Sequence, residues 1–157
     1  MGIEMTLEGK PVPAFDMPTA DGDRVCDGAL MGQPYVLYFY PKADTPGCTT
    51  EGKDFSALMD DFAAAGARVI GVSKDTVKKL SNFKAKHDLT VTLASDEDES
   101  VCAAFGTWVE KSMYGRTYMG IERATFLVDA GGVVRKQWPR VKVKGHAEEV
   151  LQAVRNL

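Results

Sequence analysis

Residues 35–51 read YVLYFYPKADTPGCTTE, and this stretch sets the expectation for the whole fold. Its first six residues are aromatic or apolar, and the turn residues GQP at 32–34 precede them. A short, continuous apolar run between turn signals is typical of a strand buried on both faces of a sheet. We expect this strand to end at Pro41, a loop to span residues 42–47, and a helix to follow.

Strands and helices are predicted to alternate outward from this run. Apolar residues at helical spacing over 55–62, closed by Gly66, indicate a helix. Further strands are expected at 68–73, 91–94, 124–128 and 133–138, and further helices at 76–87, 98–105 and 146–156. The last two strands are joined by DAGG, a hairpin signal. This order predicts an α/β, thioredoxin-like fold with a central mixed β-sheet flanked by α-helices, and a flavodoxin-like doubly wound sheet is the alternative.

Length and composition favour an ordinary globular protein. The 157 residues fit one domain over 1–157, and 45% apolar with 26% charged residues excludes a disordered chain. The net charge is −3, so a nucleic-acid-binding surface is not expected. The densest basic stretch, residues 141–144 (VKVK), alternates apolar and basic residues as a half-exposed strand would.

The N-terminus and the cysteines point to the cytoplasm. Residues 1–10 carry two glutamates and no apolar stretch, unlike a signal peptide, and no run is long enough to span a membrane. Three widely spaced cysteines, Cys26, Cys48 and Cys102, do not form a disulfide framework. The cysteines and histidines also lack the spacing of metal ligands.

Cys48 stands out because it lies just past the buried strand, at or near the first turn of the next helix. Backbone N–H groups in that turn lack helical partners, and the helix dipole is positive there, so both favour a thiolate. Thr45 lies three residues earlier and can direct its hydroxyl toward the sulfur or its substrate. Glu51 lies three residues later, on the same helix face. A carboxylate there disfavours a thiolate, so a nearby cation is needed.

Pro41, Thr45 and Cys48 form the pattern Pro-x-x-x-Thr-x-x-Cys, through which the chain resembles the peroxiredoxin family. It looks most like the bacterioferritin comigratory protein, or PrxQ, subfamily. The resemblance covers most of the chain, through further segments at 48–51, 71–75, 93–96, 115–126 and 141–151.

The resemblance implies a thiol peroxidase acting on hydrogen peroxide and organic hydroperoxides. Cys48 would attack a peroxide oxygen and become a sulfenic acid, Thr45 would hydrogen-bond in the site, and Pro41 would shield the sulfur. Arg123 would supply the missing cation, and Glu51 would hold Arg123 in place. Such a site needs no metal, flavin or haem.

The chain departs from many relatives in lacking a resolving cysteine at the usual places, which here are Lys53 and Lys84. A one-cysteine (1-Cys) cycle is therefore expected, with an external thiol such as thioredoxin, a glutaredoxin or glutathione as reductant. The resemblance also favours a monomer. Cys102 lies in an apolar helical stretch and reads as core, whereas Cys26 follows a turn, and a resolving role for either stays open.

Three other functions compete with the peroxidase. A thioredoxin-like disulfide reductase normally uses Cys-x-x-Cys, which is absent. A flavodoxin-like cofactor module needs a glycine-rich phosphate loop, where this chain has Pro41 and Pro46. A redox sensor or holdase that uses Cys48 as a switch remains the alternative.

Overall fold

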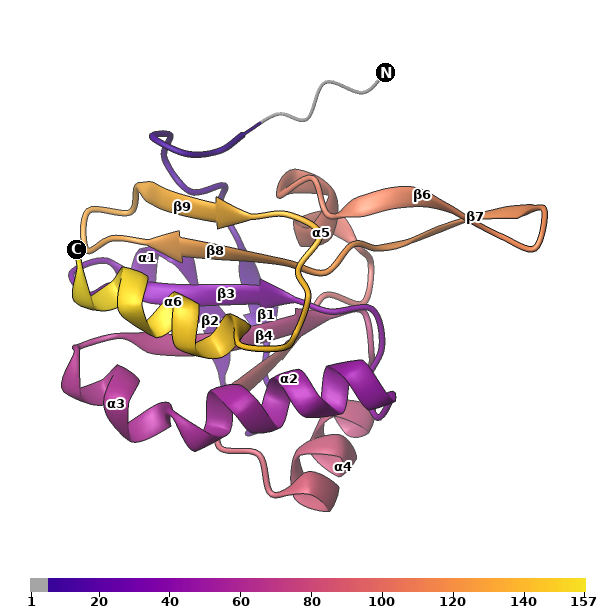
Figure 1. The fold of residues 1–157 in the computed structure, drawn as a ribbon, viewed down its shortest axis with the longest axis horizontal. Helices are drawn as coiled ribbons and strands as arrows, with labels where there is room; N and C mark the ends of the chain where they lie inside the picture. Colours follow the sequence, from indigo (N-terminus) through magenta and orange to yellow (C-terminus); the bar gives the residue numbers. More distant parts are fainter. Residues whose placement is uncertain (1–5) are drawn as a thin grey trace.

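A five-stranded sheet forms the centre of the computed structural model, which describes residues 6–157 (Figure 1). Its strand order is β5-β4-β3-β8-β9. The strands are β3 (Tyr35–Phe39), β4 (Arg68–Ser73), β5 (Thr92–Ser95), β8 (Ala124–Val128) and β9 (Val134–Trp138). β3 pairs in parallel with β4 and antiparallel with β8, so the sheet is mixed. This confirms the thioredoxin-like fold, because a flavodoxin-like sheet would place parallel strands on both sides of β3.

The apolar run at 35–39 forms the predicted strand because its residues are covered from both sides. Every residue of β3 and of β8 is buried. Alternate side chains point to opposite faces of the sheet, and each face carries its own hydrophobic cluster. A strand covered in this way has no polar face, which is why its sequence lacks the apolar–polar alternation of a surface strand.

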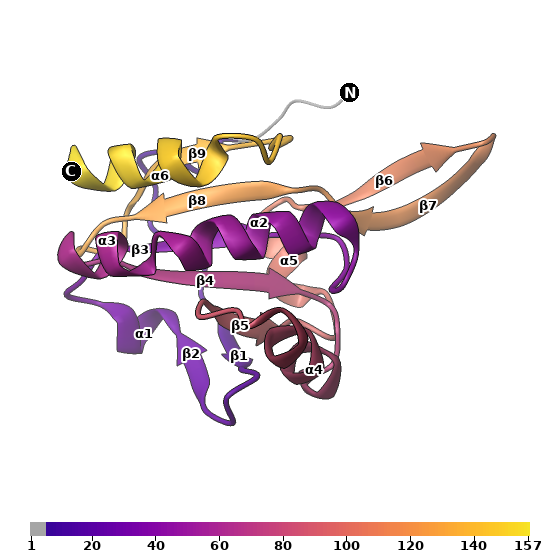
Figure 2. The ribbon, with the colours of Figure 1, turned by 60° about the horizontal axis from the view of Figure 1, so that its bottom comes forward.

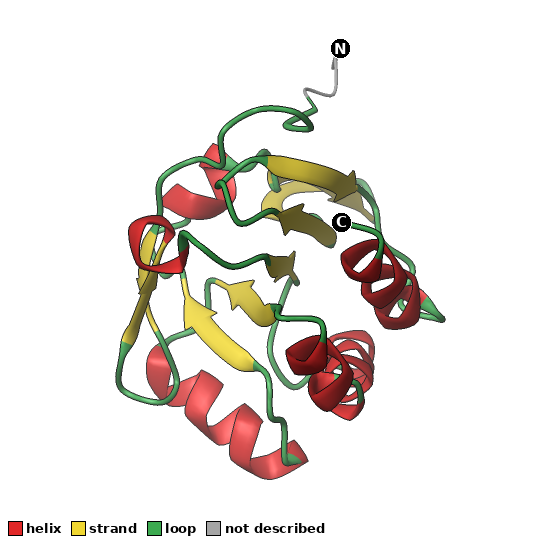
Figure 3. Ribbon diagram, turned by 90° about the vertical axis from the view of Figure 1, so that its left-hand side faces the viewer, coloured by secondary structure: helices red, strands yellow, loops and turns green. Residues whose placement is uncertain are grey.

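Helices lie on both sides of the sheet (Figure 3). One face is covered by α2 (Pro46–Ala57), α3 (Met59–Ala64), α4 (Val77–His87) and α6 (His146–Arg155). The other is covered by α1 (Asp27–Leu30), α5 (Ser100–Ala104) and the small hairpin of β1 (Asp16–Pro18) and β2 (Arg24–Cys26). We call these the α2 face and the α5 face. Cys48 belongs to the cluster on the α2 face, and Cys102 to the cluster on the α5 face.

Two local predictions were wrong. The helix expected over 55–62 is two helices, which meet at Leu58, where the backbone leaves the helical region (φ −103°, ψ 7°). Residues 141–144 form a loop rather than a strand. Their alternation arises because Val141 and Val143 are half-buried, with Val141 packed against the α2-face cluster, while the two lysines between and after them are exposed.

A hairpin that the sequence analysis did not predict projects from the body of the molecule (Figure 2). It consists of β6 (Trp108–Met113) and β7 (Arg116–Ile121), which pair only with each other. Its turn residues Tyr114 and Gly115 both have positive φ (51° and 77°), as in the two-residue turns that match the twist of a hairpin. β7 leads directly into Arg123 and β8, so the hairpin lies beside the site described next.

Residues 1–5, part of the segment expected to carry no signal sequence, lie outside the described residues. Over residues 6–157, no helix combines the length and the apolar character needed to cross a membrane.

Candidate active site

Cys48 is the third residue of α2 and is 2% exposed. β3 ends at Phe39, the chain bends at Pro41, and Pro46 begins the helix, where its fixed φ suits the first helical position. Thr45 occupies the N-cap position but makes no side-chain capping hydrogen bond. The first-turn N–H groups therefore have no side-chain cap. The positive end of the helix dipole lies in this turn, which also contains Cys48.

The register of the sheet brings Arg123 to Cys48. Phe39, at the end of β3, lies opposite Ala124, at the start of β8. Cys48 lies in the helix that follows β3 and Arg123 directly precedes β8, so the two meet although 75 residues separate them in sequence. The Arg123 Nη2 donates to Cys48 Sγ at 3.3 Å, and the Arg123 carbonyl accepts from the Val141 N–H at 2.9 Å. The guanidinium, a cation, is thus fixed beside the sulfur.

Glu51 completes the cluster from one turn further along α2. Its side chain is 1% exposed, and its Oε1 accepts from Arg123 Nη1 at 2.5 Å. Burial raises the pKa of Glu51 to about 7, although Arg123 acts in the opposite direction. Burial alone would lower the pKa of Arg123, but Glu51 and Cys48 together raise it, so the guanidinium stays charged.

The structure therefore brings together three of the five predicted site residues: Cys48, Glu51 and Arg123. Pro41 and Thr45 lie in the loop between β3 and α2, both half-buried. The Thr45 hydroxyl donates to the Lys42 carbonyl at 2.8 Å, and so its hydrogen is not directed at the sulfur. The roles of all five in chemistry stay predictions.

Sequence reasoning missed the residues that hold this loop in place. The Asp75 carboxylate accepts from the Ala43 N–H at 2.8 Å and from the Ser73 hydroxyl at 2.7 Å. Asp44 contacts Lys86 at 2.8 Å and His87 at 2.7 Å, which ties the loop to α4. The only signal in the sequence was the matching segment at 71–75, which contains Asp75 but does not say what it binds.

Two further residues shape the space around Arg123. A Cβ added at Gly47 would lie 3.1 Å from Arg123 Nη2, so glycine at this position lets the guanidinium approach the helix. Lys111, from β6, donates to the Ile121 carbonyl at 2.5 Å. Burial, and then the charge of Arg123, lower the pKa of Lys111. No motif in the sequence marks either residue.

A groove of about 590 Å³ runs along α2 from the turn that holds Cys48. Pro46, Gly47 and Thr50 line one wall, and Val143 and Gly145 line the other. It therefore opens beside the residues that precede the sulfur. Among residues 6–157, no three His, Cys, Asp or Glu side chains are grouped to hold a metal ion.

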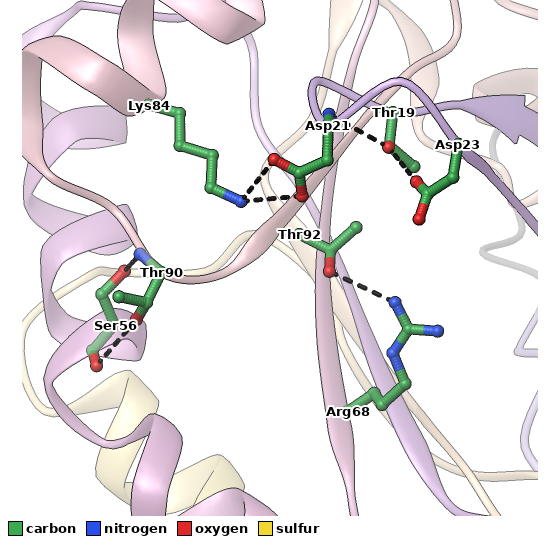
Figure 4. Close-up of polar contacts among 8 residues, drawn as sticks. All are labelled: Thr19, Asp21, Asp23, Ser56, Arg68, Lys84, Thr90 and Thr92. Carbon is green, nitrogen blue, oxygen red and sulfur yellow. Dashed lines mark hydrogen bonds and ion pairs between the residues drawn. The ribbon is translucent and has the colours of Figure 1, made fainter.

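The other two cysteines lie away from this cluster. Cys102 and the helix that follows Cys26 pack on the α5 face, with the sheet between them and Cys48. Lys84, at one usual place for a resolving cysteine, forms an ion pair with Asp21 at 3.0 Å, which links α4 to the β1–β2 hairpin (Figure 4). Lys53, at the other place, is exposed.

Comparison with known proteins gives consistent results. Residues 9–137 match the model of the AhpC/TSA family. The peroxiredoxin Bcp of Xanthomonas campestris is 48% identical over 147 residues, covering 92% of both chains. That of Bacillus subtilis is 43% identical over 154 residues, covering 98% of both. A solved structure of the Xanthomonas campestris bacterioferritin comigratory protein, described for its alkyl peroxide reduction activity, superimposes with a TM-score of 0.87 at 46% identity, covering 90% of each chain.

Proposed function

Because the chain belongs to the AhpC/TSA family and, within it, to the Bcp/PrxQ peroxiredoxins, it is a thiol peroxidase, and we propose that Cys48 is its attacking residue. The observation that carries this proposal is the 3.3 Å contact between Cys48 Sγ and the guanidinium of Arg123, in a turn whose N–H groups carry no side-chain cap. A thiolate held in this way attacks a peroxide oxygen, and the O–O bond breaks as a sulfenic acid forms.

Arg123 acts twice in the proposed reaction. Its positive charge favours the thiolate before attack, and its N–H groups stabilise the charge that develops on the leaving oxygen. Glu51 holds the guanidinium in place, Pro41 shields the sulfur, and Thr45 hydrogen-bonds to the peroxide through its hydroxyl oxygen. We propose hydrogen peroxide and organic hydroperoxides as substrates, because the groove along α2, which Pro46 and Gly47 line, has room for an alkyl group.

The cycle we propose is of the 1-Cys type, reduced by an external thiol such as thioredoxin, a glutaredoxin or glutathione. Two observations support it: Lys53 and Lys84 occupy the usual resolving positions, and Cys102 lies on the opposite face of the sheet. A sulfenic acid on Cys48 therefore meets no thiol of its own chain in this fold.

We further infer that the chain acts as one domain, as a monomer, in the cytoplasm. One sheet joins strands from residue 35 to residue 138, which supports a single domain. The three unpaired cysteines suit a reducing compartment.

Intact mass and peptide mapping after one equivalent of peroxide, without reductant, test the proposal. We expect a gain of about 16 Da on Cys48 that a sulfenic-acid reagent traps. A loss of about 2 Da, with Cys48 joined to Cys26 or Cys102, would contradict the 1-Cys cycle but keep the peroxidase. An unmodified Cys48 would overturn its assignment as the attacking residue.

Repeated turnover at high peroxide provides a second test. A sulfenic acid without a resolving cysteine stays exposed to further oxidation, so we expect sulfinic acid on Cys48 sooner than in two-cysteine relatives.

Steady-state peroxide consumption also separates the enzyme from a redox sensor or holdase, because a sensor need react only once.

A further inference from the structure

Glu51 has an unusual environment for a carboxylate. It is 1% exposed, and its Oε1 is held by Arg123. Its other oxygen, Oε2, is buried and has no hydrogen-bond partner among the described residues. A buried carboxylate oxygen without a donor is costly when the group is ionised, whereas a protonated carboxyl loses most of that cost.

Arg123 is also shared between two acidic groups. Its Nη1 contacts Glu51 and its Nη2 contacts Cys48. When Cys48 is a thiolate and Glu51 is ionised, two buried negative charges depend on one guanidinium, and the cluster carries a net charge of −1. Two acids in such a site do not both ionise readily, and their titrations are linked.

The remaining neighbours do not supply a second cation to Glu51. From α2, Asp54 adds negative charge, which itself raises the pKa of Glu51. Tyr38 from β3 and Tyr40, which follows β3, are neutral, since burial raises the pKa of both. On α6, Glu148 is a further carboxylate, near Asp54. His146, also on α6, has its pKa lowered to about 4 by burial, so it is uncharged at neutral pH.

Lys111 is a further cation in this region, and it interacts electrostatically with Arg123 and Cys48. It contributes to the electrostatic surroundings of Cys48 and Arg123, and its ammonium is bonded to the Ile121 carbonyl. The charge on Glu51 therefore depends on Arg123, and through Arg123 on the state of Cys48.

We propose that Glu51 is protonated while Cys48 is a thiolate, and that it gives up this proton when peroxide oxidises the sulfur. The inference deepens the proposed function and rests on it. Glu51 does not touch the reacting atoms in this scheme, so it is a positioning residue that also stores the proton of the reaction.

The proton balance follows from the chemistry. The thiolate gives two electrons to the peroxide, the S–O bond forms, the O–O bond breaks, and an alkoxide or hydroxide leaves. The leaving oxygen takes up one proton to become alcohol or water, and Glu51 releases one as the sulfur loses its negative charge; solvent carries the proton between them and neither gains nor loses one. Before the reaction the cluster holds thiolate, guanidinium and carboxyl; afterwards it holds sulfenic acid, guanidinium and carboxylate. Its net charge is zero in both states, so no uncompensated charge is buried at any stage.

Return to the starting state is also balanced. Two external thiols reduce the sulfenic acid, release water and form their own disulfide, which leaves Cys48 as a thiol. Its proton passes to Glu51 as the thiolate reforms beside Arg123. The enzyme thus takes no net proton from solvent during oxidation, whereas a thiolate with a permanently ionised neighbour would take one.

Proton uptake in a single turnover tests this directly. The reduced full chain is mixed with hydrogen peroxide in weakly buffered solution just below neutral pH. A pH indicator reports proton uptake, and mass spectrometry quantifies the sulfenic acid formed. We expect the unmodified protein to take up well under one proton per sulfenic acid, and Glu51→Gln to take up about one. Glu110→Gln, an exposed change on β6, is the control and should behave like the unmodified protein.

An infrared difference spectrum gives a second readout that does not depend on the variant. Oxidation should remove the carbonyl band of a protonated carboxylic acid from the unmodified protein. Uptake of a full proton by the unmodified protein, without loss of this band, would overturn the proposal. So would negligible uptake in both proteins, since the proton would then have come from a Cys48 thiol. Failure of Cys48 to form a sulfenic acid at all would instead count against the proposed function.

Discussion

Cys48 and Cys102 lie at matching places on the two faces of the sheet. Each is the third residue of a helix that follows a strand, α2 after β3 and α5 after β5. Both are buried, at 2% and 0% exposure. Burial and position in the helix therefore do not distinguish the two thiols.

Their polar neighbours are of opposite sign. Cys48 receives an N–H from Arg123, and the first turn of α2 has no side-chain cap. At the start of α5, the Asp96 carboxylate accepts from the backbone N–H groups of Val101 and Cys102, at 3.1 and 2.7 Å. Burial, followed by this carboxylate, raises the pKa of Cys102 well above its usual range. From this comparison we expect the charge placed beside the helix start, rather than burial, to decide which of the two thiols is reactive.

Exchanging each cysteine for serine gives the largest expected contrast. Cys48→Ser should lower kcat/KM for hydrogen peroxide on the order of 10³-fold or more, because the nucleophile is lost. Cys102→Ser should leave kcat/KM within about twofold, since this thiol is on the other face. Steady-state peroxide consumption measures both, and a comparable loss in the two variants would break the distinction.

Removing the cation beside Cys48 should have the next largest effect. Arg123→Met keeps much of the side chain's length but none of its charge, and we expect kcat/KM to fall about 10²–10³-fold, as for other lost transition-state donors. Arg123→Lys keeps the positive charge but loses the planar guanidinium that contacts Glu51 and Cys48 through two separate nitrogens. Its kcat/KM should therefore lie between those of the unmodified protein and Arg123→Met. An unchanged rate for Arg123→Met would show that the helix start alone activates the sulfur.

On the α5 face, the corresponding change should affect stability rather than rate. Asp96→Ala leaves two buried N–H groups without their acceptor, at a cost of about 1–3 kcal/mol in the free energy of unfolding. Urea denaturation measures this loss, and Glu97→Ala, at an exposed neighbouring position, is the control. Activity per folded molecule should stay the same; a large drop in kcat/KM would mean that the two faces communicate.

A methyl group at Gly47 should have the smallest effect. Its Cβ would lie 3.1 Å from Arg123 Nη2, so Gly47→Ala should shift the guanidinium and lower kcat/KM by about tenfold or less. Gly28→Ala, whose Cβ would meet nothing within 4 Å, is the matched control and should leave the rate unchanged. Equal rates for the two variants would show that the guanidinium tolerates displacement.

The sequence predicted the Cys48 side of the site better than the rest because its signals are local. A buried strand, a proline bend and a helix start lie within 17 residues, at 35–51. Arg123 could be assigned only through the family resemblance, because its contact with Cys48 depends on the pairing of β3 with β8. Asp96 was not recognised as the partner of Cys102, since its role depends on backbone groups at the start of a five-residue helix.

The missed β6–β7 hairpin has a different cause. Most residues of β7 are exposed, so they show no apolar–polar alternation to distinguish a strand from a loop. The turn at Tyr114 and Gly115 was the available signal, and it is weak without flanking alternation. The break between α2 and α3 at Leu58 left no signal, because the apolar spacing continues through it.

The antiparallel pairing of β3 with β8 also determines when, during synthesis and folding, Arg123 comes to lie beside Cys48. A nascent chain that has emerged from the ribosome only as far as β5 contains Cys48 and Glu51, but Arg123 has not yet emerged. Tyr35 and Val128, which pair across the two strands, must first close a loop of about 90 residues, and long closures of this kind nucleate slowly. The proposed attacking thiol therefore gains its neighbouring cation late, in the same step that completes the sheet, and an unfinished or unfolded chain presents Cys48 without Arg123 beside it.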